Sequence, residues 1–337
     1  MNYIPKDYIE RTYAGWLGKL IGVRYGAPTE GASFEYLKQY YGKLDGYILD
    51  YKDFAADDDS NGPMFFLRAL EDAGKGRDTS AQDMALAWLN YPPYESGFYW
   101  WGGYGNSTEH TAYLNLQSGI SAPRSGSIEQ NGATVAEQIG GQIFSDTWGL
   151  VAPNNVELAA NLAGKMASVS HGGNGKYGGM FIAACISAAY TEIDIEQVIN
   201  KALSTIPEDC DYSMVTRDIV RFYHENPDDW EKCFWYIRQN YWQEKFPGAC
   251  HIIPNSALMI MGMMYGQGDF DKTLNITHMG GFDTDCTVGN IGTIMGTFVG
   301  LDGINYKKWR LQINDFFCAS SCIGYLNIMN APDCVAY

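Results

Sequence analysis

The stretch GGFDTDCTVGNIGTIMGTFVG, residues 280 to 300, indicates the fold of this chain more clearly than any other segment. Its glycines recur every three or four residues, which places them on one face of a helix. Each glycine costs a helix about 1 kcal/mol relative to alanine. A row of glycines lets two backbones approach closely, so we expect tight packing in a helical core, which could also form the rigid floor beneath a site. A second row lies in DYIERTYAGWLGKLIGV (7–23). The two rows are Gly289, Gly292, Gly296 and Gly300, and Gly15, Gly18 and Gly22.

Helical periodicity continues along most of the chain, and convincing strand alternation is scarce. Breaks at Pro, Asp and Gly separate the helical segments. We therefore predict an all-α protein of many short helices in one compact domain, residues 1–337, without repeats or linkers. Helices are expected over 7–23, 155–170, 175–190, 195–206, 213–226, 229–242, 254–266, 269–280 and 284–300.

Composition restricts the class of partner. The 337 residues are 46% hydrophobic and 14% aromatic, which is typical of a globular protein with a large core. The net charge of −16 argues against a nucleic-acid partner, because phosphate backbones require a basic face. A phosphorylated small molecule is not excluded, since a local pocket can hold it.

The N-terminal segment is charged where a signal peptide would be apolar. The longest nearly apolar run, 178–190, is too short to span a bilayer. We therefore expect a cytoplasmic protein that does not bind membranes. The eight cysteines lie mostly singly, and we interpret them as structural or incidental thiols rather than a zinc site.

The segment 90–113 is rich in Tyr, Trp, Gly and Pro and cannot form one regular element. One interpretation is a loop that covers a pocket, with Trp100 and Trp101 against the distal part of a substrate. The other is a loop packed on the surface by its own aromatic side chains. The sequence leaves both open.

Two acidic clusters pose a physical problem, because like charges in a row repel. Asp57, Asp58 and Asp59 precede a helix expected near Pro63, and Asp283 and Asp285 lie at the start of the glycine-rich helix. Any single aspartate could be a helix cap. Five carboxylates are more than two caps require, and hard divalent cations would neutralise them if the fold brings the clusters together. Two cations about 4 Å apart would suit so large a cluster, and a solvated acidic surface is the alternative.

A third segment, SVSHGGNGKYGGMF (168–181), carries a glycine-rich turn into a helix. Backbone N–H groups at such a turn suit an anion such as phosphate, and the histidine could hydrogen-bond a sugar hydroxyl. A structural histidine at a helix entrance is the alternative. The candidate substrate-binding residues here are His171, Gly172, Gly173, Asn174 and Gly175.

Together these segments resemble the ADP-ribosylglycohydrolase family, from about residue 10 to 302. GWLGKLIGVRYGAPTEG (15–31) is similar to the family's opening G-x-x-x-G-D-x-x-G-x-P-x-E-G, and DDDS (57–60) occupies the place of T-D-D-T. SHGGNGKYGGMF (170–181) resembles the histidine-bearing segment. GGFDTDCTVGNIGTIMGTFVG resembles the signature G-G-D-T-D-T/N-x-x-x-x-G-x-x-x-G.

The resemblance implies an all-helical fold with two Mg²⁺ ions in a cleft, which Mn²⁺ or Ca²⁺ could replace. Carried over by position, the metal ligands would be Asp58 and Asp59, with Asp57 in place of a threonine, and Asp283 and Asp285.

Cys286 stands where a threonine often ligates the metal, and a thiol is a poor magnesium ligand. Glu30 matches the glutamate that the family places beside the metals and uses in the reaction. Glu30 and Asp58 are therefore the candidate catalytic residues.

The chain also departs from the family pattern. Val23 replaces the aspartate of the opening motif. The family's substrate loop G-N-G-x-x-M-R corresponds to QIGGQIF (138–144), where Ile139 and Phe144 replace the asparagine and the arginine. The metal frame is kept while the substrate contacts are altered, so a less-studied branch of the family is indicated.

The resemblance implies metal-dependent hydrolysis of an N- or O-glycosidic bond at a ribose, with ADP-ribose on a modified protein as the substrate. One alternative is a hydrolase of nucleosides or other small N-ribosyl compounds that uses the same metals. A second alternative is a non-catalytic member that binds ADP-ribose or serves structurally.

Overall fold

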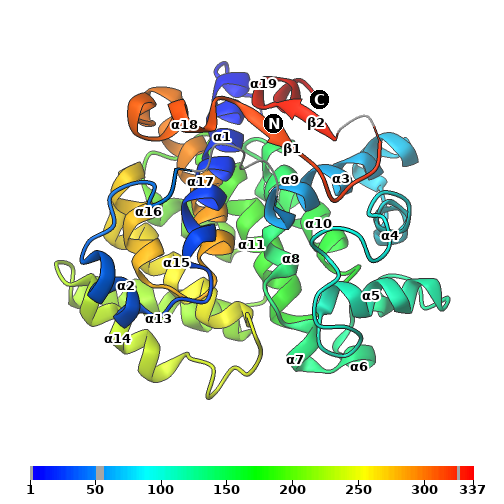
Figure 1. Cartoon of the computed structure of the whole chain (residues 1–337), viewed down its shortest axis with the longest axis horizontal. Helices are drawn as coiled ribbons and strands as arrows, with labels where there is room; N and C mark the ends of the chain where they lie inside the picture. Colours follow the sequence, from blue (N-terminus) through cyan, green and yellow to red (C-terminus); the bar gives the residue numbers. More distant parts are fainter. Residues whose placement is uncertain (1–2, 51–56, 325–326) are drawn as a thin grey trace.

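The computed structural model describes residues 3–50, 57–324 and 327–337, and it is almost entirely helical (Figure 1). The first half contains α1 (Tyr8–Gly26), η1 (Ala27–Thr29), α2 (Phe34–Tyr41), α3 (Asp58–Ala73), η2 (Gly76–Asp78), α4 (Ala81–Asn90), α5 (Thr108–Gln117), η3 (Arg124–Gly126), α6 (Ile128–Asn131), α7 (Ala133–Ala136), α8 (Gly140–Ile143), α9 (Asp146–Leu150) and α10 (Val156–Ala167). The second half contains α11 (Gly173–Ala189), α12 (Ile195–Leu203), α13 (Asp211–Glu225), α14 (Trp230–Asn240), α15 (Ile252–Gly266), α16 (Phe270–Met279), α17 (Thr284–Val299), η4 (Leu301–Gly303), η5 (Tyr306–Arg310), α18 (Leu311–Ile313), β1 (Phe316–Cys318), β2 (Ile328–Asn330) and α19 (Ala331–Ala336).

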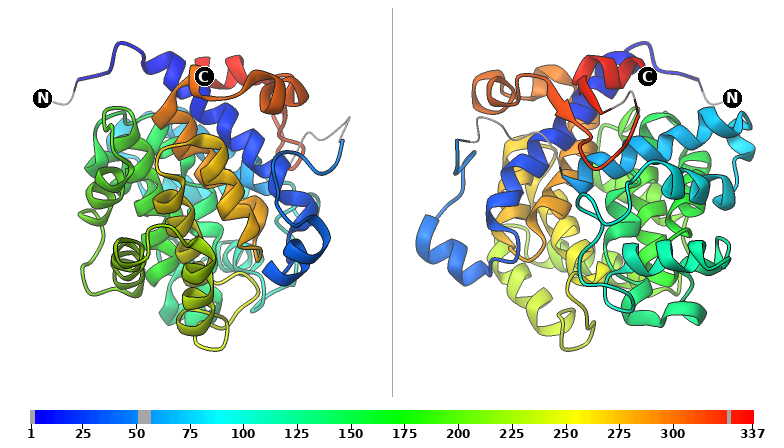
Figure 2. Two further views of the ribbon diagram at one scale, coloured as in Figure 1. Left: turned by 90° about the vertical axis from the view of Figure 1, so that its left-hand side faces the viewer. Right: turned by 45° about the vertical axis from the view of Figure 1, so that its right-hand side comes forward.

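The all-α prediction is confirmed, and the two glycine rows explain how the fold is held together. Helices α1 and α17 lie side by side, blue against orange in Figure 2. A Cβ atom added to Gly18 would lie 2.0 Å from the carbonyl oxygen of Gly292, and one added to Gly22 would lie 2.2 Å from that of Val288. Only glycine allows backbones this close. Gly300 lies outside the row, because it ends α17 with a φ of +70°.

Gly18→Ala is expected to lower the free energy of unfolding by at least about 3 kcal/mol, because the obstructing atom belongs to a backbone that cannot rotate away. The control is Gly164→Ala in α10, where an added Cβ would meet the flexible side chain of Met180 at 3.0 Å. Helix propensity should leave that control within about 1 kcal/mol of the native protein. Equal denaturation midpoints for the two variants would contradict this account of the helix pair.

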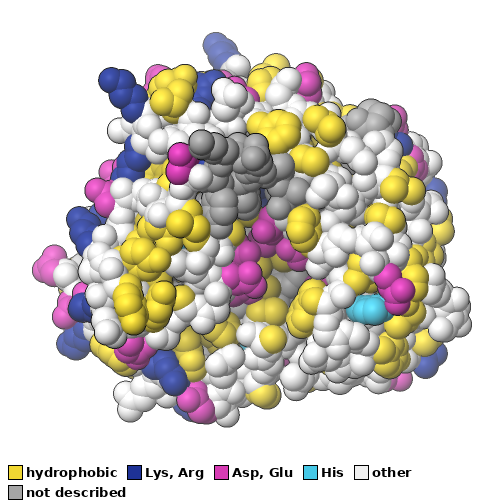
Figure 3. Space-filling view, viewed as in Figure 1, with side chains coloured by type: hydrophobic (Ala, Val, Ile, Leu, Met, Phe, Trp, Pro, Cys, Tyr) yellow, Lys and Arg dark blue, Asp and Glu magenta, His cyan; other side chains and the backbone are white. Residues whose placement is uncertain are grey.

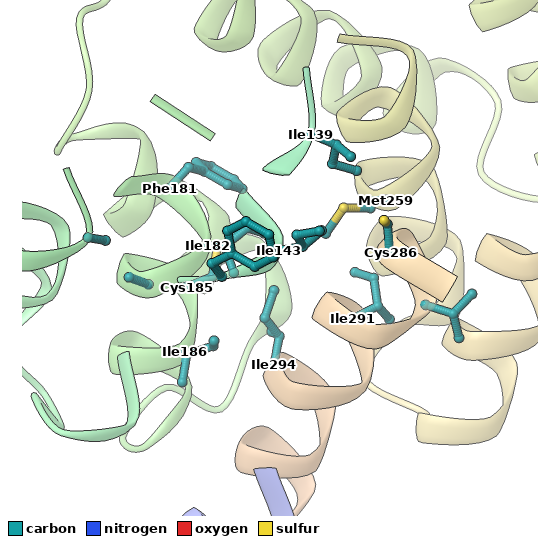
Figure 4. Close-up of a cluster of buried hydrophobic side chains, with 14 of the residues drawn as sticks. Ile139, Ile143, Phe181, Ile182, Cys185, Ile186, Met259, Cys286, Ile291 and Ile294 are labelled. Atoms are coloured by element: carbon teal, nitrogen blue, oxygen red, sulfur yellow. The ribbon is translucent and has the colours of Figure 1, made fainter. Parts of the chain in front are cut away.

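Helix α11 runs through the centre of the core and contacts α8, α9, α10, α12, α15 and α17. Most of its residues are buried, because small side chains let neighbours pack on several faces. Figure 4 shows Phe181, Ile182, Cys185 and Ile186 of α11 meeting side chains from α8, α15 and α17. None of the described helices has the length and apolar composition needed to cross a bilayer.

The structure corrects the start of α3 and adds a small hairpin. The helix was expected to begin near Pro63, but it begins at Asp58, and the proline lies inside it. The Asp57 carboxylate caps the helix by accepting a hydrogen bond from the Asp59 N–H at 3.1 Å. The helix therefore begins earlier because Asp57 caps it. Pro63 lacks an N–H group, so one backbone hydrogen bond of the helix is missing. Strands β1 and β2 form a short antiparallel pair near the C-terminus.

Candidate active site

A cavity of about 580 Å³ opens on one face of the molecule, and acidic side chains gather in a hollow near the centre of that face (Figure 3). Its wall combines carboxylic groups with apolar side chains. The carboxylic residues are Glu30, Asp57, Asp58, Asp59, Glu109, Asp283 and Asp285, and the large apolar residues are Phe98, Trp101, Ile139, Ile143 and Phe282.

The first acidic cluster is held by the N-terminus of α3. Asp57 is its cap, and Asp58 and Asp59 occupy the first turn. The buried Asn61 donates a hydrogen bond to the Asp57 carbonyl at 2.6 Å and another to the Cys318 carbonyl at 3.3 Å. The C-terminal hairpin therefore braces the turn that presents the three carboxylates.

The second acidic cluster is tied to the loop that carries Glu30. The Gly31 N–H donates to the Phe282 carbonyl at 2.7 Å, and the Phe282 N–H donates to the Ala32 carbonyl at 2.8 Å. This reciprocal pair fixes Asp283, the residue that precedes α17, beside Glu30. Two segments more than 200 residues apart thus form one edge of the cavity.

The two clusters meet at Asp59. The Cys286 thiol donates to one Asp59 carboxylate oxygen at 3.3 Å, and the Lys19 ammonium lies 3.4 Å from the other. Lys19 is fully buried and also pairs with Asp146 at 3.0 Å. Burial alone would lower the pKa of Lys19, but Asp146 and Asp59 raise it, so the ammonium stays charged. Asp59 is therefore anchored from both sides.

The cluster has the donors and the electrostatics expected of a divalent-cation site. Burial raises the pKa of Asp58, Asp59 and Asp285 well above the usual range, and repulsion from neighbouring aspartates raises it further. One oxygen of Asp285 is buried without a hydrogen-bond partner among the described residues. Within each cluster, one potential ligand atom per residue lies within 4.8 Å of the others. Carboxylate oxygens that repel each other, one of them without a donor, fit Mg²⁺ or Mn²⁺.

The family model described as ADP-ribosylglycohydrolase matches residues 4–327. The chain belongs to the ADP-ribosylglycohydrolase family. The family implies glycohydrolase activity on ADP-ribose-type substrates and is generally metal-dependent.

One similar solved structure is described as an ADP-ribosylglycohydrolase-related protein complex. It has 16% identity and a TM-score of 0.57, over 92% of this chain and 95% of that chain. At this identity the likeness shows the fold alone. A comparison with curated proteins found no match.

Of three departures from the ADP-ribosylglycohydrolase pattern, one lines this cavity and two lie outside its lining. Ile139 lines it, and Phe144 is fully buried beside Gly62, where an added Cβ would lie 2.2 Å from the ring. Val23 lies over Gly289 beside Lys19. The three altered positions are thus apolar. The buried Lys19–Asp146 ion pair is a feature that the sequence analysis did not identify.

Glu109 is a cavity residue that the sequence analysis missed. It lies in the first turn of α5 and is 4% exposed. Burial raises the pKa of Glu109 to about 7. The His171 ring lies behind it, with Nε2 at 3.8 Å from the Glu109 carboxylate and Nδ1 at 2.7 Å from the Ser170 hydroxyl. Burial lowers the pKa of His171 to about 3, so the ring is neutral. No motif or spacing in the sequence marked this glutamate.

The structure does not bring the turn 172–175 to the cavity. Gly172 caps α11, and the Asn174 N–H donates to the Glu137 carboxylate at 2.7 Å. A Cβ atom on Gly173 would lie 2.2 Å from the same carboxylate. The chain's own glutamate therefore sits where the sequence predicted a phosphate, and Gly175 packs against the Ala136 carbonyl instead.

The aromatic segment 90–113 combines the two interpretations, because one tryptophan lines the cavity and the other packs within the loop. Trp101 lines the cavity. The Trp100 indole N–H donates to the carbonyls of Pro93 and Ser96 at 2.9 and 3.0 Å, and its ring packs edge-on against Tyr113. Trp100 thus holds the loop together while Trp101 contributes to the cavity wall.

Glu109→Gln is expected to flatten the decline of stability with pH. Because the pKa of about 7 exceeds the ordinary carboxyl value of 4.5, the folded state holds the proton more tightly than the unfolded state. Folding stability should fall by about 3 kcal/mol as the pH rises from 4.5 to 7, and the glutamine variant should lack that loss. Denaturant titrations at pH 5 and pH 8 without divalent cations measure it, with the exposed Glu129→Gln as control. If folding stability fell equally with pH in the native and Glu109→Gln proteins, the raised pKa of Glu109 would be ruled out.

Proposed function

We propose that this member of the ADP-ribosylglycohydrolase family is a metal-dependent hydrolase of a ribosyl glycosidic bond. The observation that carries the proposal is the meeting of the clusters 57–59 and 283–285 with Glu30 at one cavity. A group of mutually repelling carboxylates, of which Asp59, Asp283 and Asp285 are buried, has little reason to persist as structure alone. Their donors suit cation binding, and the cavity leaves room for a substrate.

The carboxylates of Asp57, Asp58, Asp59, Asp283 and Asp285 would hold the cations, with Asp59 oriented by Lys19 and Cys286. When bound, divalent cations would lower the pKa of a coordinated water and would bind the hydroxyl oxygens of the ribose. Burial raises the pKa of the Cys286 thiol well above its ordinary value, so this side chain remains protonated and donates to Asp59 instead of ligating the metal.

Two further carboxyls are suited to proton transfer. Glu30 is exposed at the edge of the cavity. Desolvation by the surrounding protein, together with the nearby Asp283 and Asp57, raises the pKa of its carboxyl, which makes it a better base at neutral pH than an ordinary glutamate. Glu109, with a pKa of about 7, is partly protonated and can donate to a leaving group. The negative wall stabilises the positive charge that develops on the ribose ring in the transition state.

The family-implied substrate is ADP-ribose linked to a modified protein, and a small ribosyl compound is the alternative partner. Trp101 and Phe98 offer aromatic faces against which an adenine or another base can stack. Two proton-transfer groups with displaced pKa values favour an enzyme over a non-catalytic binding protein.

A hydrolysis assay tests the proposal. Purified protein is incubated with Mg²⁺ or Mn²⁺ and a panel of arginine- and serine-ADP-ribosylated peptides and nucleosides, and free ribosyl product is quantified. We expect turnover that a chelator removes and added cation restores. Absence of turnover on every ribosyl substrate at saturating cation would refute the proposal.

A further inference from the structure

The cavity carries more negative charge than the proposed cations would cancel. Seven carboxylic side chains line it, and among its described lining residues none is lysine, arginine or histidine. Two divalent cations would offset four of the charges. Lys19 lies behind Asp59, and its charge is already opposed by Asp146. The field inside the cavity therefore opposes an anionic substrate group.

The anion site that the sequence predicted at the turn 172–175 is filled by the chain itself. The N-terminus of α11 binds the Glu137 carboxylate through the N–H and the side-chain amide of Asn174, at 2.7 and 3.0 Å. Burial opposes ionisation of Glu137, but hydrogen bonds from His251 and Asn174 hold its pKa below the usual value. A phosphate would have to displace a stably ionised carboxylate, and this helix end does not line the cavity.

The remaining wall is suited to an uncharged or cationic ring. Phe98, Trp101 and Phe282 supply aromatic faces, and Ile139 and Ile143 supply an aliphatic surface. Aromatic faces attract both flat heterocycles and cations. The acidic side of the cavity provides acceptors for the hydroxyl groups of a ribose.

We infer, resting on the proposed function, that the preferred substrate is a ribosyl compound without a phosphate or diphosphate, whose leaving group is a neutral or cationic heterocycle. In the reaction, the oxygen of water bonds to C1′ of the ribose as the C1′–N bond breaks. The bonding pair leaves with the heterocycle, and the water proton passes to Glu30. A neutral leaving base takes up a proton from Glu109, whereas a cationic one leaves as the neutral base.

Matched substrate pairs test the inference. Nicotinamide riboside and nicotinamide mononucleotide share the ribose and leaving group and differ only in the 5′-phosphate; adenosine, AMP and ADP-ribose form a second series. With Mg²⁺ in excess, kcat/KM should be about 10- to 100-fold higher for each nucleoside than for its phosphorylated counterpart. Equal or faster hydrolysis of the phosphorylated compounds would overturn the inference while leaving the proposed function intact. No hydrolysis of any member would overturn the inference, and the proposed function would fall with it only if the ADP-ribosylated peptides were also left intact.

Variants at Gln243 connect that preference to cavity charge. This exposed side chain lines the cavity and donates to the Gly248 carbonyl at 3.1 Å. Gln243→Arg should narrow the nucleoside-to-nucleotide ratio of kcat/KM by about threefold or more, and Gln243→Glu should widen it. Because the two variants differ in charge at one position, opposite shifts cannot come from a general loss of folding. Ratios that stay unchanged in both variants would show that cavity charge does not select the substrate.

Discussion

Asp285→Asn is expected to lower turnover at least about 1000-fold and to abolish high-affinity cation binding, while making the cation-free protein more stable. Asp285 lies in the first turn of α17, and one of its oxygens has no partner among the described residues. Burial and repulsion from Asp57 and Asp283 raise its pKa. A neutral side chain relieves that repulsion but removes a ligand for the metal on which the proposed chemistry depends.

The sign of the stability change follows from proton linkage. Because the pKa of Asp285 is higher in the folded state than in the unfolded state, the cation-free protein loses stability as the pH rises above the ordinary value of 3.8. The asparagine side chain does not ionise, so the variant should not lose stability in this way. The melting temperature of Asp285→Asn without cation should therefore exceed that of the native protein at pH 7 and should no longer rise when Mn²⁺ is added.

The control for this variant is Asp269→Asn, which changes an exposed helix cap that accepts a hydrogen bond from the Lys272 N–H. Asparagine caps as well as aspartate, so activity, cation affinity and melting temperature should stay near native. If Asp285→Asn bound Mn²⁺ with native affinity, Asp285 would not be a ligand.

Glu30→Gln is expected to lower kcat by about 100- to 10,000-fold, the usual contribution of a general acid or base, with little change in cation affinity. Glu30 lies outside both groups of carboxylates whose ligand atoms converge within 4.8 Å, and its loop is fixed by backbone hydrogen bonds that glutamine leaves intact. Calorimetric titration with Mn²⁺ and steady-state kinetics separate the two effects.

The pH profile adds a second readout for Glu30. Because the pKa of Glu30 is raised, kcat/KM should fall on the acidic side at a higher pH than an ordinary glutamate would give. The exposed Glu35→Gln in α2 serves as the matched control and should leave kinetics unchanged. Native kcat in Glu30→Gln would exclude this residue from proton transfer.

Local patterns predicted the features that repeat in the sequence. Glycines at helical spacing predicted close backbone packing, and the structure shows that the two rows face each other across α1 and α17. The two acidic clusters were visible because consecutive carboxylates at helix starts are costly unless something neutralises them. That the two clusters meet was a hypothesis from the sequence. In the structure both line one cavity, and the hydrogen bond from Cys286 to Asp59 joins them.

Features that depend on pairing between distant segments were not predictable from one sequence. Nothing near Glu109 indicates that α5 would place it on the cavity wall in front of His171. Nothing in the sequence around Lys19 indicates that its ammonium is buried and paired with Asp146. Likewise, the turn 172–175 has the local chemistry of an anion site, and only the fold reveals that Glu137 fills it.

The central claim is that the two acidic clusters share cations, and anomalous diffraction from a crystal soaked in Mn²⁺ tests it most directly. The account predicts anomalous peaks in the cavity with carboxylate oxygens from both 57–59 and 283–285 at about 2.1–2.3 Å. Peaks confined to one cluster, or no peak at saturating Mn²⁺, would contradict it.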